Sequence, residues 1–340
     1  MSMYRATATL RAQWLALALA ACAAPAAALD LAREEVRAFA EEMQQKHGFD
    51  AAWLGGVLAD AEINQKVIER MTRPAEAVMP WHRYRDHFLT AERIDAGVEF
   101  WTAHRDEIAQ IGETTGVAPH VIVGIIGAET FFGRITGRDR VVDALATLAF
   151  DYPPRSKYFR SELEQFLLLA REEGFDVATV QGSYAGAMGR GQFMPSSYRR
   201  YASDGDGDGK RDLWGSWPDV FASVANYLAE HGWRDGEPVV VPASLWFPKA
   251  DGLVAGKLSP DTTIKALRDR GLAFDTTQDA KAPALFIRVD GDAGPELRAG
   301  FHNFGVITRY NRSILYALVV NDLGARIQSL LPPPAAAPAP

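Results

Sequence analysis

The sequence predicts a mainly helical protein of the α+β class, with a helical body and a small β-rich insertion. Three observations support this prediction. Apolar residues recur at helical spacing through most of residues 30–231. Short β-like runs at 239–241, 285–289 and 297–301 are confined to one later stretch. A last helical pattern follows them, so we expect the chain to return to the helical body.

The composition is that of a globular protein, and it excludes several classes. The 340 residues suffice for two modest domains or for one large domain with an insertion. Lys and Arg number 36 against 43 Asp and Glu, and the net charge of −7 argues against a general nucleic-acid binder. A single cysteine excludes an intramolecular disulfide and a multi-cysteine zinc site.

The N-terminal residues predict a secretory signal peptide. Arg5 and Arg11 precede an apolar run that is too short to span a bilayer and is followed by small residues. Two processing sites remain open. Cleavage after Ala28 makes residues 1–28 the signal peptide, whereas a lipobox-like sequence at 19–22 leaves residues 1–21 as the signal and lipidates Cys22. Both alternatives take the protein out of the cytoplasm.

Capping residues and helix breakers divide the rest of the chain. Residues 29–90 predict an N-terminal helical lobe, in which Asp30 and Asp50 can cap helices to about 46 and 61, and Asn64 can begin a third. Residues 75–90 predict a connector within it. Residues 91–235 predict the core, 236–303 the small β-rich lobe, and 304–331 a C-terminal segment whose helix, from 311 to 331, completes the core. Residues 332–340 are all Pro and Ala, and we expect disorder there.

Within the core, Thr90 opens a long helix that is predicted to continue to Ile111. Pro119 falls in the first turn of the next helix, whose apolar residues at spacings of three and four predict burial on more than one side. Further helices are predicted at 163–173 and 219–231, and a weak one at 263–270.

Glu129 is the candidate catalytic residue. It follows Ile122, Ile125 and Ile126 at helical spacing and therefore shares their apolar face. A carboxyl group in apolar surroundings has a raised pKa because its charged form is disfavoured, and an enzyme can thereby keep a general acid protonated near neutral pH. Spacing alone favours the alternative, a Glu at a helix end that faces solvent or pairs with Arg134.

A glycine-rich stretch at 183–195 is a candidate ligand-binding loop. With Gly182 just before it, four glycines lie within the ten residues 182–191 and let the backbone approach a ligand closely. Ser183, Tyr184 and Gln192 can form hydrogen bonds, and the Tyr184 ring can stack on a sugar. The stretch lacks the GxxxxGK pattern of a P-loop, which excludes that kind of nucleotide site.

Residues 204–210 match the first seven positions of an EF-hand calcium loop. Asp204, Asp206 and Asp208 occupy positions 1, 3 and 5, Gly209 occupies position 6, and the Lys210 carbonyl falls at position 7. Position 12 is Gly215 and not the usual bidentate Glu. The alternative is an acidic turn without a metal, although its closely spaced carboxylates would repel one another. Calcium here would hold the loop and take no part in chemistry.

Four segments together resemble the membrane-bound lytic murein transglycosylase B family, glycoside hydrolase family 103. They are IVGIIGAET at 122–130, DALATL at 143–148, GAMGRGQFMPSSY at 186–198 and SVANY at 223–227, and the resemblance covers about residues 31–329. It implies a lysozyme-like core and cleavage of the β-1,4 bond between N-acetylmuramic acid and N-acetylglucosamine in peptidoglycan. It also implies a periplasmic monomer, anchored to the outer membrane if Cys22 is lipidated, with no organic cofactor.

The resemblance implies a role for each residue that matches a family motif. Glu129 becomes the single catalytic carboxyl, which protonates the leaving oxygen and then accepts the proton of the muramic C6 hydroxyl, so that a 1,6-anhydro ring closes. Asp219 becomes the residue that closes a lengthened calcium loop. The implied sugar-binding residues are Ser183, Tyr184, Gln192, Tyr227, Tyr310, Asn311, Tyr316, Tyr84 and Arg155. The family often has two successive Arg where this chain has Pro154 and Arg155. A hydrolytic muramidase and a non-catalytic peptidoglycan-binding scaffold are the alternatives.

Overall fold

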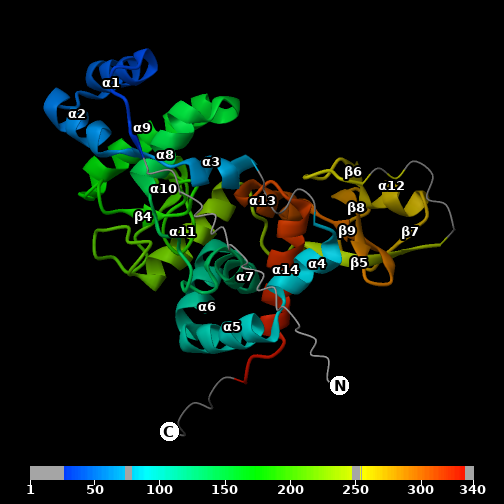
Figure 1. Ribbon diagram of the computed structural model, residues 1–340. Helices are drawn as coiled ribbons and strands as arrows, with labels where there is room; N and C mark the ends of the chain where they lie inside the picture. The colour runs from blue at the N-terminus through cyan, green and yellow to red at the C-terminus, as the bar shows by residue number, and fades with distance from the viewer. Residues whose placement is uncertain (1–26, 73–78, 247–252, 254, 334–340) are drawn as a thin grey trace, which may run out of the picture.

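The apolar helix α7 (Pro119–Thr130) lies at the centre of a helical body, beside which a smaller β lobe projects (Figure 1). The structure is a computed structural model and describes residues 27–72, 79–246, 253 and 255–333. Cys22, the rest of residues 1–26 and tail residues 334–340 lie outside the described residues. The prediction of a mainly helical fold with a small β-rich insertion is confirmed.

Helix α7 is buried on nearly every side, as its composition predicts. Pro119 occupies its first turn, and every residue from 121 to 127 is buried. Its main neighbour is α14 (Ile314–Gln328). Gly124 and Gly324 allow this approach, because a Cβ atom at either position would overlap a carbonyl oxygen of the other helix. Two segments from distant parts of the chain thus form the central helix pair.

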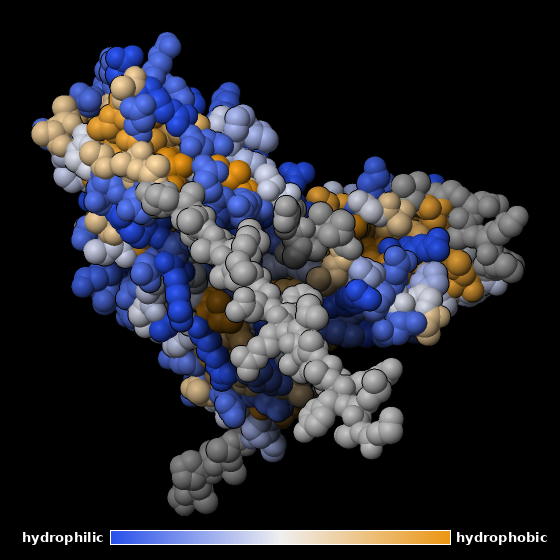
Figure 2. All heavy atoms as spheres, viewed as in Figure 1, coloured by the Kyte–Doolittle hydropathy of each residue, from blue (hydrophilic) through white to orange (hydrophobic). Residues whose placement is uncertain are grey.

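The N-terminal lobe contains α1 (Glu34–His47), α2 (Ala51–Asp60) and α3 (Gln65–Thr72). The Asp50 side chain caps α2 by accepting the Trp53 N–H at 2.7 Å, as predicted. The predicted cap at Asp30 is wrong. Its carboxylate accepts the N–H of Ala32 in a local turn, and α1 begins only at Glu34. Apolar residues gather over α1 and α2 (Figure 2), where Trp53 is 42% exposed.

A short pair of strands bears on the processing of the N-terminus. β1 (Ala27–Ala28) pairs with β2 (Glu62–Ile63), and the Leu29 N–H donates to the Ala61 carbonyl at 2.9 Å. Cleavage after Ala28 would remove β1, whereas a chain that begins at Cys22 would keep it.

Two helix boundaries predicted from the sequence are wrong. Residues 75–90 are not only a connector, because α4 (Trp81–Phe88) forms there and buries Trp81 and Tyr84. The long helix predicted from Thr90 is two helices, α5 (Ala91–Ala103) and α6 (Arg105–Thr115), which meet at His104. The His104 ring packs against the rings of Trp217 and Phe221, and these tertiary contacts lie where the sequence has no Gly or Pro to mark a break.

The second half of the body contains four helices before the β lobe: α8 (Val141–Asp151), α9 (Ser156–Glu173), α10 (Pro195–Tyr201) and α11 (Trp217–Glu230). Strands β3 (Asp139–Arg140) and β4 (Gln181–Gly182) pair beside them, and a 3₁₀ turn covers Pro153–Arg155. The helix predicted from residue 163 begins earlier, at Ser156. The final helix predicted from Asn311 is α14 alone, and a separate helix, α13 (His302–Tyr310), precedes it.

The β lobe has a small core of its own. Its sheet is antiparallel and has the strand order β6-β8-β9-β5-β7. The strands are β5 (Val240–Leu245), β6 (Thr262–Thr263), β7 (Leu272–Ala273), β8 (Pro283–Gly291) and β9 (Gly294–Gly300). Helix α12 (Ile264–Asp269) buries Ile264 and Leu267 against Phe286 and Phe301. The chain enters this lobe from α11 and leaves it into α13.

No single described helix is long and apolar enough to cross a bilayer. Helices α6 and α7 pass such a test only when they are taken together, and they are bent by 118° at their junction.

Candidate active site

Glu129 lies in the last turn of α7, where it is half-buried. The hydroxyl of Tyr316, in the first turn of α14, donates a hydrogen bond of 2.7 Å to Glu129 Oε1. Ser313 caps α14 by accepting the N–H of Tyr316 at 3.2 Å, which fixes the backbone that carries this tyrosine. Arg134, with which the alternative sequence interpretation paired Glu129, has its guanidinium over the ring of Phe131 at 4.9 Å.

Two tyrosine hydroxyls lie within the electrostatic reach of Glu129. Burial, and then the charge of Glu129, raise the pKa values of Tyr310 and Tyr316 well above that of a free tyrosine. Both hydroxyls therefore stay protonated and act as hydrogen-bond donors. The Tyr310 hydroxyl donates to the Gly191 carbonyl at 2.6 Å, so it joins α13 to the glycine-rich loop.

An aromatic wall extends from this point. The rings of Tyr310 and Tyr227 lie 4.8 Å apart, and each is 5.8 Å from the ring of Phe193. The Tyr227 hydroxyl donates to the Arg309 carbonyl at 2.7 Å, and burial raises the pKa of Tyr227 to about 12. Rings at these separations pack edge to face and form a rigid surface beside Glu129.

Thr130 joins α7 to the glycine-rich loop. Its side chain is fully buried, and its Oγ1 donates to the Arg190 carbonyl at 2.9 Å and accepts the Gly133 N–H at 3.0 Å. The sequence analysis missed this residue. The sequence did contain a signal for it, because a hydroxyl residue directly follows the candidate carboxyl and stands three positions before a glycine.

The chain turns sharply just after Glu129. Phe131 and Phe132 have φ values of 49° and 56°, in the left-handed region that non-glycine residues rarely adopt. Such conformations persist only where the surrounding structure imposes them, and they concentrate at functional sites. Here the Phe132 ring packs 5.2 Å from the ring of Phe100 on α5.

Ser183 and Gln192 hold the shape of the glycine-rich loop. Ser183 Oγ accepts the N–H of Ala187 at 3.0 Å, and Gln192 Nε2 donates to the carbonyls of Thr136 and Gly189, each at 3.0 Å. Gln192 also has a positive φ of 52°. Within the described residues, Gln192 Oε1 accepts no hydrogen bond, so it can still accept one from a ligand.

A buried carboxylate that the sequence analysis did not select holds the far end of this loop. Glu162 on α9 is 3% exposed and accepts the backbone N–H of Ser196 at 2.9 Å and its hydroxyl at 2.7 Å. Both of these donors belong to the first turn of α10. A carboxylate at a helix N-terminus is stabilised by the unpaired N–H groups and the helix dipole.

The remaining predicted binding residues differ in their surroundings. Tyr84 is buried, packs 5.0 Å from Phe88, and adds to the raised pKa of Tyr316. Asn311 ends α13 and is half-buried. Tyr184 lies 5.8 Å beneath the Arg70 guanidinium, and exposed Arg155 stacks over Tyr158 at 4.6 Å. Tyr316, Tyr310, Tyr227 and Tyr84 thus gather around Glu129, whereas contacts of the described residues do not link Tyr184 or Arg155 to it.

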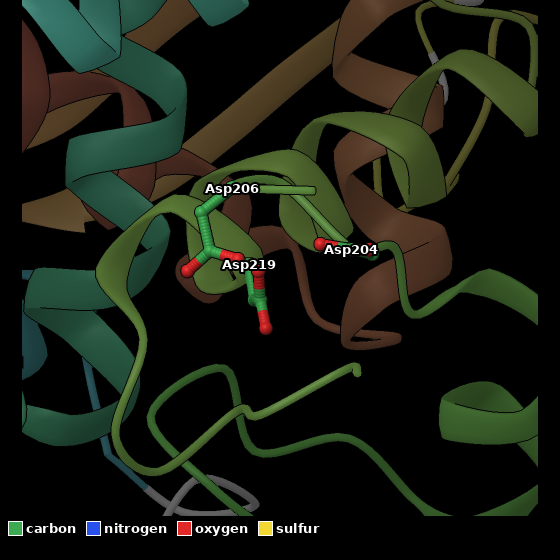
Figure 3. Close-up of side chains that lie close together, drawn as sticks. All are labelled: Asp204, Asp206 and Asp219. Carbon is green, nitrogen blue, oxygen red and sulfur yellow. The ribbon is translucent and has the colours of Figure 1, made fainter. Parts of the chain in front are cut away.

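Three carboxylates from the predicted calcium loop converge at the start of α11 (Figure 3). Oxygens of Asp204, Asp206 and Asp219 all lie within 4.8 Å of one another, and Asp219 is buried. Gly209, at position 6 of the loop pattern, has a φ of 87°, as the sharp EF-hand turn requires. Asp208 is outside this group of three, and its Oδ1 accepts the Lys210 N–H at 2.8 Å.

The donor set fits a hard divalent cation. Carboxylate oxygens are the ligands that calcium prefers, and three of them this close together repel one another unless a cation lies between them. Asp219 also organises the loop, since it accepts the N–H groups of Gly205 at 2.8 Å and Asp212 at 2.6 Å. Asp212 turns away to accept the N–H groups of Trp214 and Gly215.

Comparison with known proteins gives the family. The family model described as "Transglycosylase SLT domain" matches residues 31–325. Over 298 residues the chain is 42% identical to "Membrane-bound lytic murein transglycosylase B" of Escherichia coli (strain K12), and the match covers 85% of this chain and 81% of that protein. The chain belongs to the membrane-bound lytic murein transglycosylase B family. The resemblance drawn from the four sequence motifs is confirmed.

Solved structures of lytic transglycosylases share the fold. Catenated SltB1 from Pseudomonas aeruginosa is 44% identical, with a TM-score of 0.83, over 87% of this chain and 98% of that chain. Escherichia coli Slt35 in complex with calcium is 41% identical, with a TM-score of 0.80, and the match covers 89% of this chain and 96% of that chain. Pseudomonas aeruginosa SltB3 in complex with NAG-NAM-pentapeptide is 28% identical, with a TM-score of 0.78, and the match covers 87% of this chain and 79% of that chain. By family the chain is therefore a lytic murein transglycosylase.

Proposed function

We propose that this member of the lytic transglycosylase family cleaves the β-1,4 bond between N-acetylmuramic acid and N-acetylglucosamine in peptidoglycan and releases a 1,6-anhydromuramic product. Glu129 acts as the only acid and base. The observation that carries the proposal is the half-buried Glu129 at the end of α7, with the Tyr316 hydroxyl donating to its Oε1. Family membership and the peptidoglycan fragment in the SltB3 complex support the substrate class.

The reaction needs one carboxyl group because the substrate supplies its own nucleophile. Protonated Glu129 donates its proton to the glycosidic oxygen as the bond from that oxygen to muramic C1 breaks. The C6 hydroxyl of the same muramic residue then attacks C1 and passes its proton to the Glu129 carboxylate. Between these steps the Tyr316 hydroxyl stabilises the carboxylate through its hydrogen bond. The acid is restored, and no water is consumed.

The walls of the site bind the glycan in this proposal. Tyr227 and Tyr310 offer aromatic surface to a sugar ring, and Ser183, Gln192 and Asn311 offer hydrogen bonds. Tyr84, which helps to raise the pKa of Tyr316, contributes to the sugar-binding wall beside it. Tyr184 and Arg155 contribute farther from Glu129, where Tyr184 lies beneath Arg70 and Arg155 stacks over Tyr158.

We propose that calcium binds at Asp204, Asp206 and Asp219 and holds the loop that precedes α11. The calcium complex of Slt35 supports the metal, and the converging oxygens support the ligands. Asp208 and the Lys210 carbonyl would complete the coordination expected of an EF-hand-like loop. The metal stabilises the fold and takes no part in the reaction.

We place the protein in the periplasm as a monomer that acts on glycan strands. The relative from Escherichia coli is named membrane-bound, and an anchor at Cys22 would give this chain the same property. The pairing of β1 with β2 supports a mature chain that begins before Ala27.

Mass spectrometry of the products released from purified sacculi tests the reaction. We expect muropeptides that end in 1,6-anhydromuramic acid, lighter by one water than the hydrolytic products. Reducing-end products would establish a hydrolytic muramidase. Binding to sacculi without release of any fragment would establish a non-catalytic scaffold.

A further inference from the structure

A basic cavity lies behind the aromatic wall of the candidate active site. It has a volume of about 320 Å³ and is lined by His231, Leu258, Ser259, Thr308, Arg309 and Arg312. Its walls come from the ends of α11 and α13 and from the segment that precedes β6. The Thr308 hydroxyl donates to the Leu258 carbonyl at 2.8 Å and so joins two of these walls.

The cavity shares residues with the wall beside Glu129. The His231 ring stacks on Tyr227 at 4.2 Å, and Tyr227 donates to the Arg309 carbonyl at 2.7 Å. Tyr310, next in the chain after Arg309, contacts both Tyr227 and the glycine-rich loop. The cavity is therefore joined through Tyr227 and Tyr310 to the aromatic wall, and Tyr310 lies within electrostatic reach of Glu129.

The charge of this cavity is unbalanced. Two arginines and a histidine line it, and no carboxylate does. Four other large cavities of the described residues are each lined by at least one Asp or Glu. Within the described residues, the guanidinium groups of Arg309 and Arg312 make no ion pair. Both arginines are exposed, so water screens their mutual repulsion, and they can offer two guanidinium groups to an anion.

Helix ends account for only part of this charge. His231 and Arg309 lie at the C-termini of α11 and α13, where cations offset the helix dipole. Arg312 lies beyond α13 and has no such role. His231 Nδ1 lies 2.6 Å from the Tyr227 carbonyl and donates to it, so in the neutral ring Nε2 is an acceptor. The donors that the cavity offers to an anionic group are Arg309, Arg312 and the Ser259 hydroxyl.

We propose that this cavity binds a carboxylate of the peptidoglycan stem peptide. The inference rests on the proposed action on peptidoglycan and extends it to the peptide. The stem is attached to the muramic residue, so its carboxylates lie within reach of a site on the other side of Tyr227 and Tyr310. Arginine favours carboxylates because its planar fork can donate two hydrogen bonds to one group.

Equilibrium binding to the Glu129→Gln protein tests the proposal without turnover. The probes are NAG-NAM-pentapeptide, the same fragment with its peptide carboxylates converted to amides, and NAG-NAM without a peptide, whose lactyl carboxylate is converted to an amide. We expect the carboxylate-bearing fragment to bind more tightly than the other two. In the Arg309→Gln/Arg312→Gln double variant this preference should fall about ten-fold, because charge-assisted hydrogen bonds are lost.

Arg326→Gln is the matched control, because Arg326 is an exposed arginine in the last turn of α14, outside the cavity. It should keep the full preference. If the double variant does not fold, each single variant should show a smaller loss of the preference for the carboxylate-bearing fragment. Equal affinity for the three probes, or an equal loss for all probes in the double variant, would overturn the proposal. Product mass spectrometry with the unaltered protein tests the reaction separately, so the two proposals can fail independently.

Discussion

Tyr316 donates its hydroxyl hydrogen to Glu129 Oε1 at 2.7 Å across 187 residues of sequence. The donor lies on α14 and the acceptor on α7, which are the helices that touch through Gly124 and Gly324. The geometry of the carboxyl group therefore depends on how closely these two helices pack. Tyr316 is buried and Glu129 is half-buried, so the bond is only partly exposed to competing water.

Glu129→Gln should abolish turnover and preserve the fold. Glutamine has nearly the same shape and can still accept the Tyr316 hydrogen bond, but it cannot donate a carboxylic proton. General acid–base catalysis contributes about 10²–10⁴ to a rate, and this variant loses both roles of Glu129. The rate of sacculus clearance measures the effect. Glu113→Gln, an exposed position on α6, is the control, and wild-type clearance by the Glu129 variant would refute the assignment.

Tyr316→Phe should slow the reaction by about ten-fold and shift its pH profile. Removing the hydroxyl takes a donor away from the ionised carboxylate, so the protonated acid persists to higher pH. We therefore expect the basic limb of activity to move upward. Tyr152→Phe serves as the control, because its hydroxyl makes no hydrogen bond among the described residues. A lower rate with an unmoved limb would show that Tyr316 only supports the packing of α14.

Calcium should raise the melting temperature through the loop at the start of α11. An ion that binds only the folded protein adds about 2.7 kcal/mol at 100 times its dissociation constant. Asp206→Asn should remove most of this response, whereas Asp212→Asn should retain it, because Asp212 accepts two backbone N–H groups outside the cluster. Melting curves with calcium and with chelator measure both variants. Identical curves for the unaltered protein would exclude the site.

Thr130→Val should destabilise the protein by about 1–3 kcal/mol, because the Arg190 carbonyl and the Gly133 N–H lose a buried partner. Thr130→Ser keeps the hydroxyl and should cost much less. Urea unfolding at equilibrium gives both values. Equal losses in the two variants would show that the threonine methyl group, and not the hydrogen bonds, is what matters here.

Stability should fall in mild acid because of His120, in the first turn of α7. Burial lowers the pKa of its imidazole, although a hydrogen bond with Asn321 opposes this shift. The unfolded chain then binds the proton more readily, so stability is complete above about pH 6.5 and is lost as the pH falls through the pKa of the folded state. In His120→Gln the melting temperature should change less between about pH 7.5 and about pH 5 than in the unaltered protein. His87→Gln, at an exposed position, is the control. The same dependence of melting temperature on pH in His120→Gln and the unaltered protein would contradict the role of His120.

Residues that act through local chemistry were predictable from the sequence. Pro119 marks the start of α7, Asp50 caps α2, and the apolar pattern of α7 predicts its burial, since each depends on neighbours within a few positions. The boundaries that failed depend on distant contacts. The helix α4 is polar and is held partly by Trp81, whose indole N–H donates to Glu296 at 3.0 Å, and the break at His104 follows from aromatic packing.

The same distinction applies to the candidate site. Family motifs point to Glu129 and Tyr316 individually, but the hydrogen bond between them is a property of the helix pair. Two further features depend on which backbone groups lie within reach. They are the hydrogen bonds of Gln192 Nε2 inside its own loop and the link from Thr130 to Arg190. No pattern of residue types along the chain contains that information.

The pairing of α7 with α14 also means that the proposed site is completed by the last helices of the chain. The ribosome makes α7 well before α14, and the β lobe is made in between. Tyr310 and Tyr316, which lie within electrostatic reach of Glu129, belong to α13 and α14. A chain that ends before α13 therefore lacks both tyrosines, and truncation there would leave Glu129 without the hydrogen bond from Tyr316.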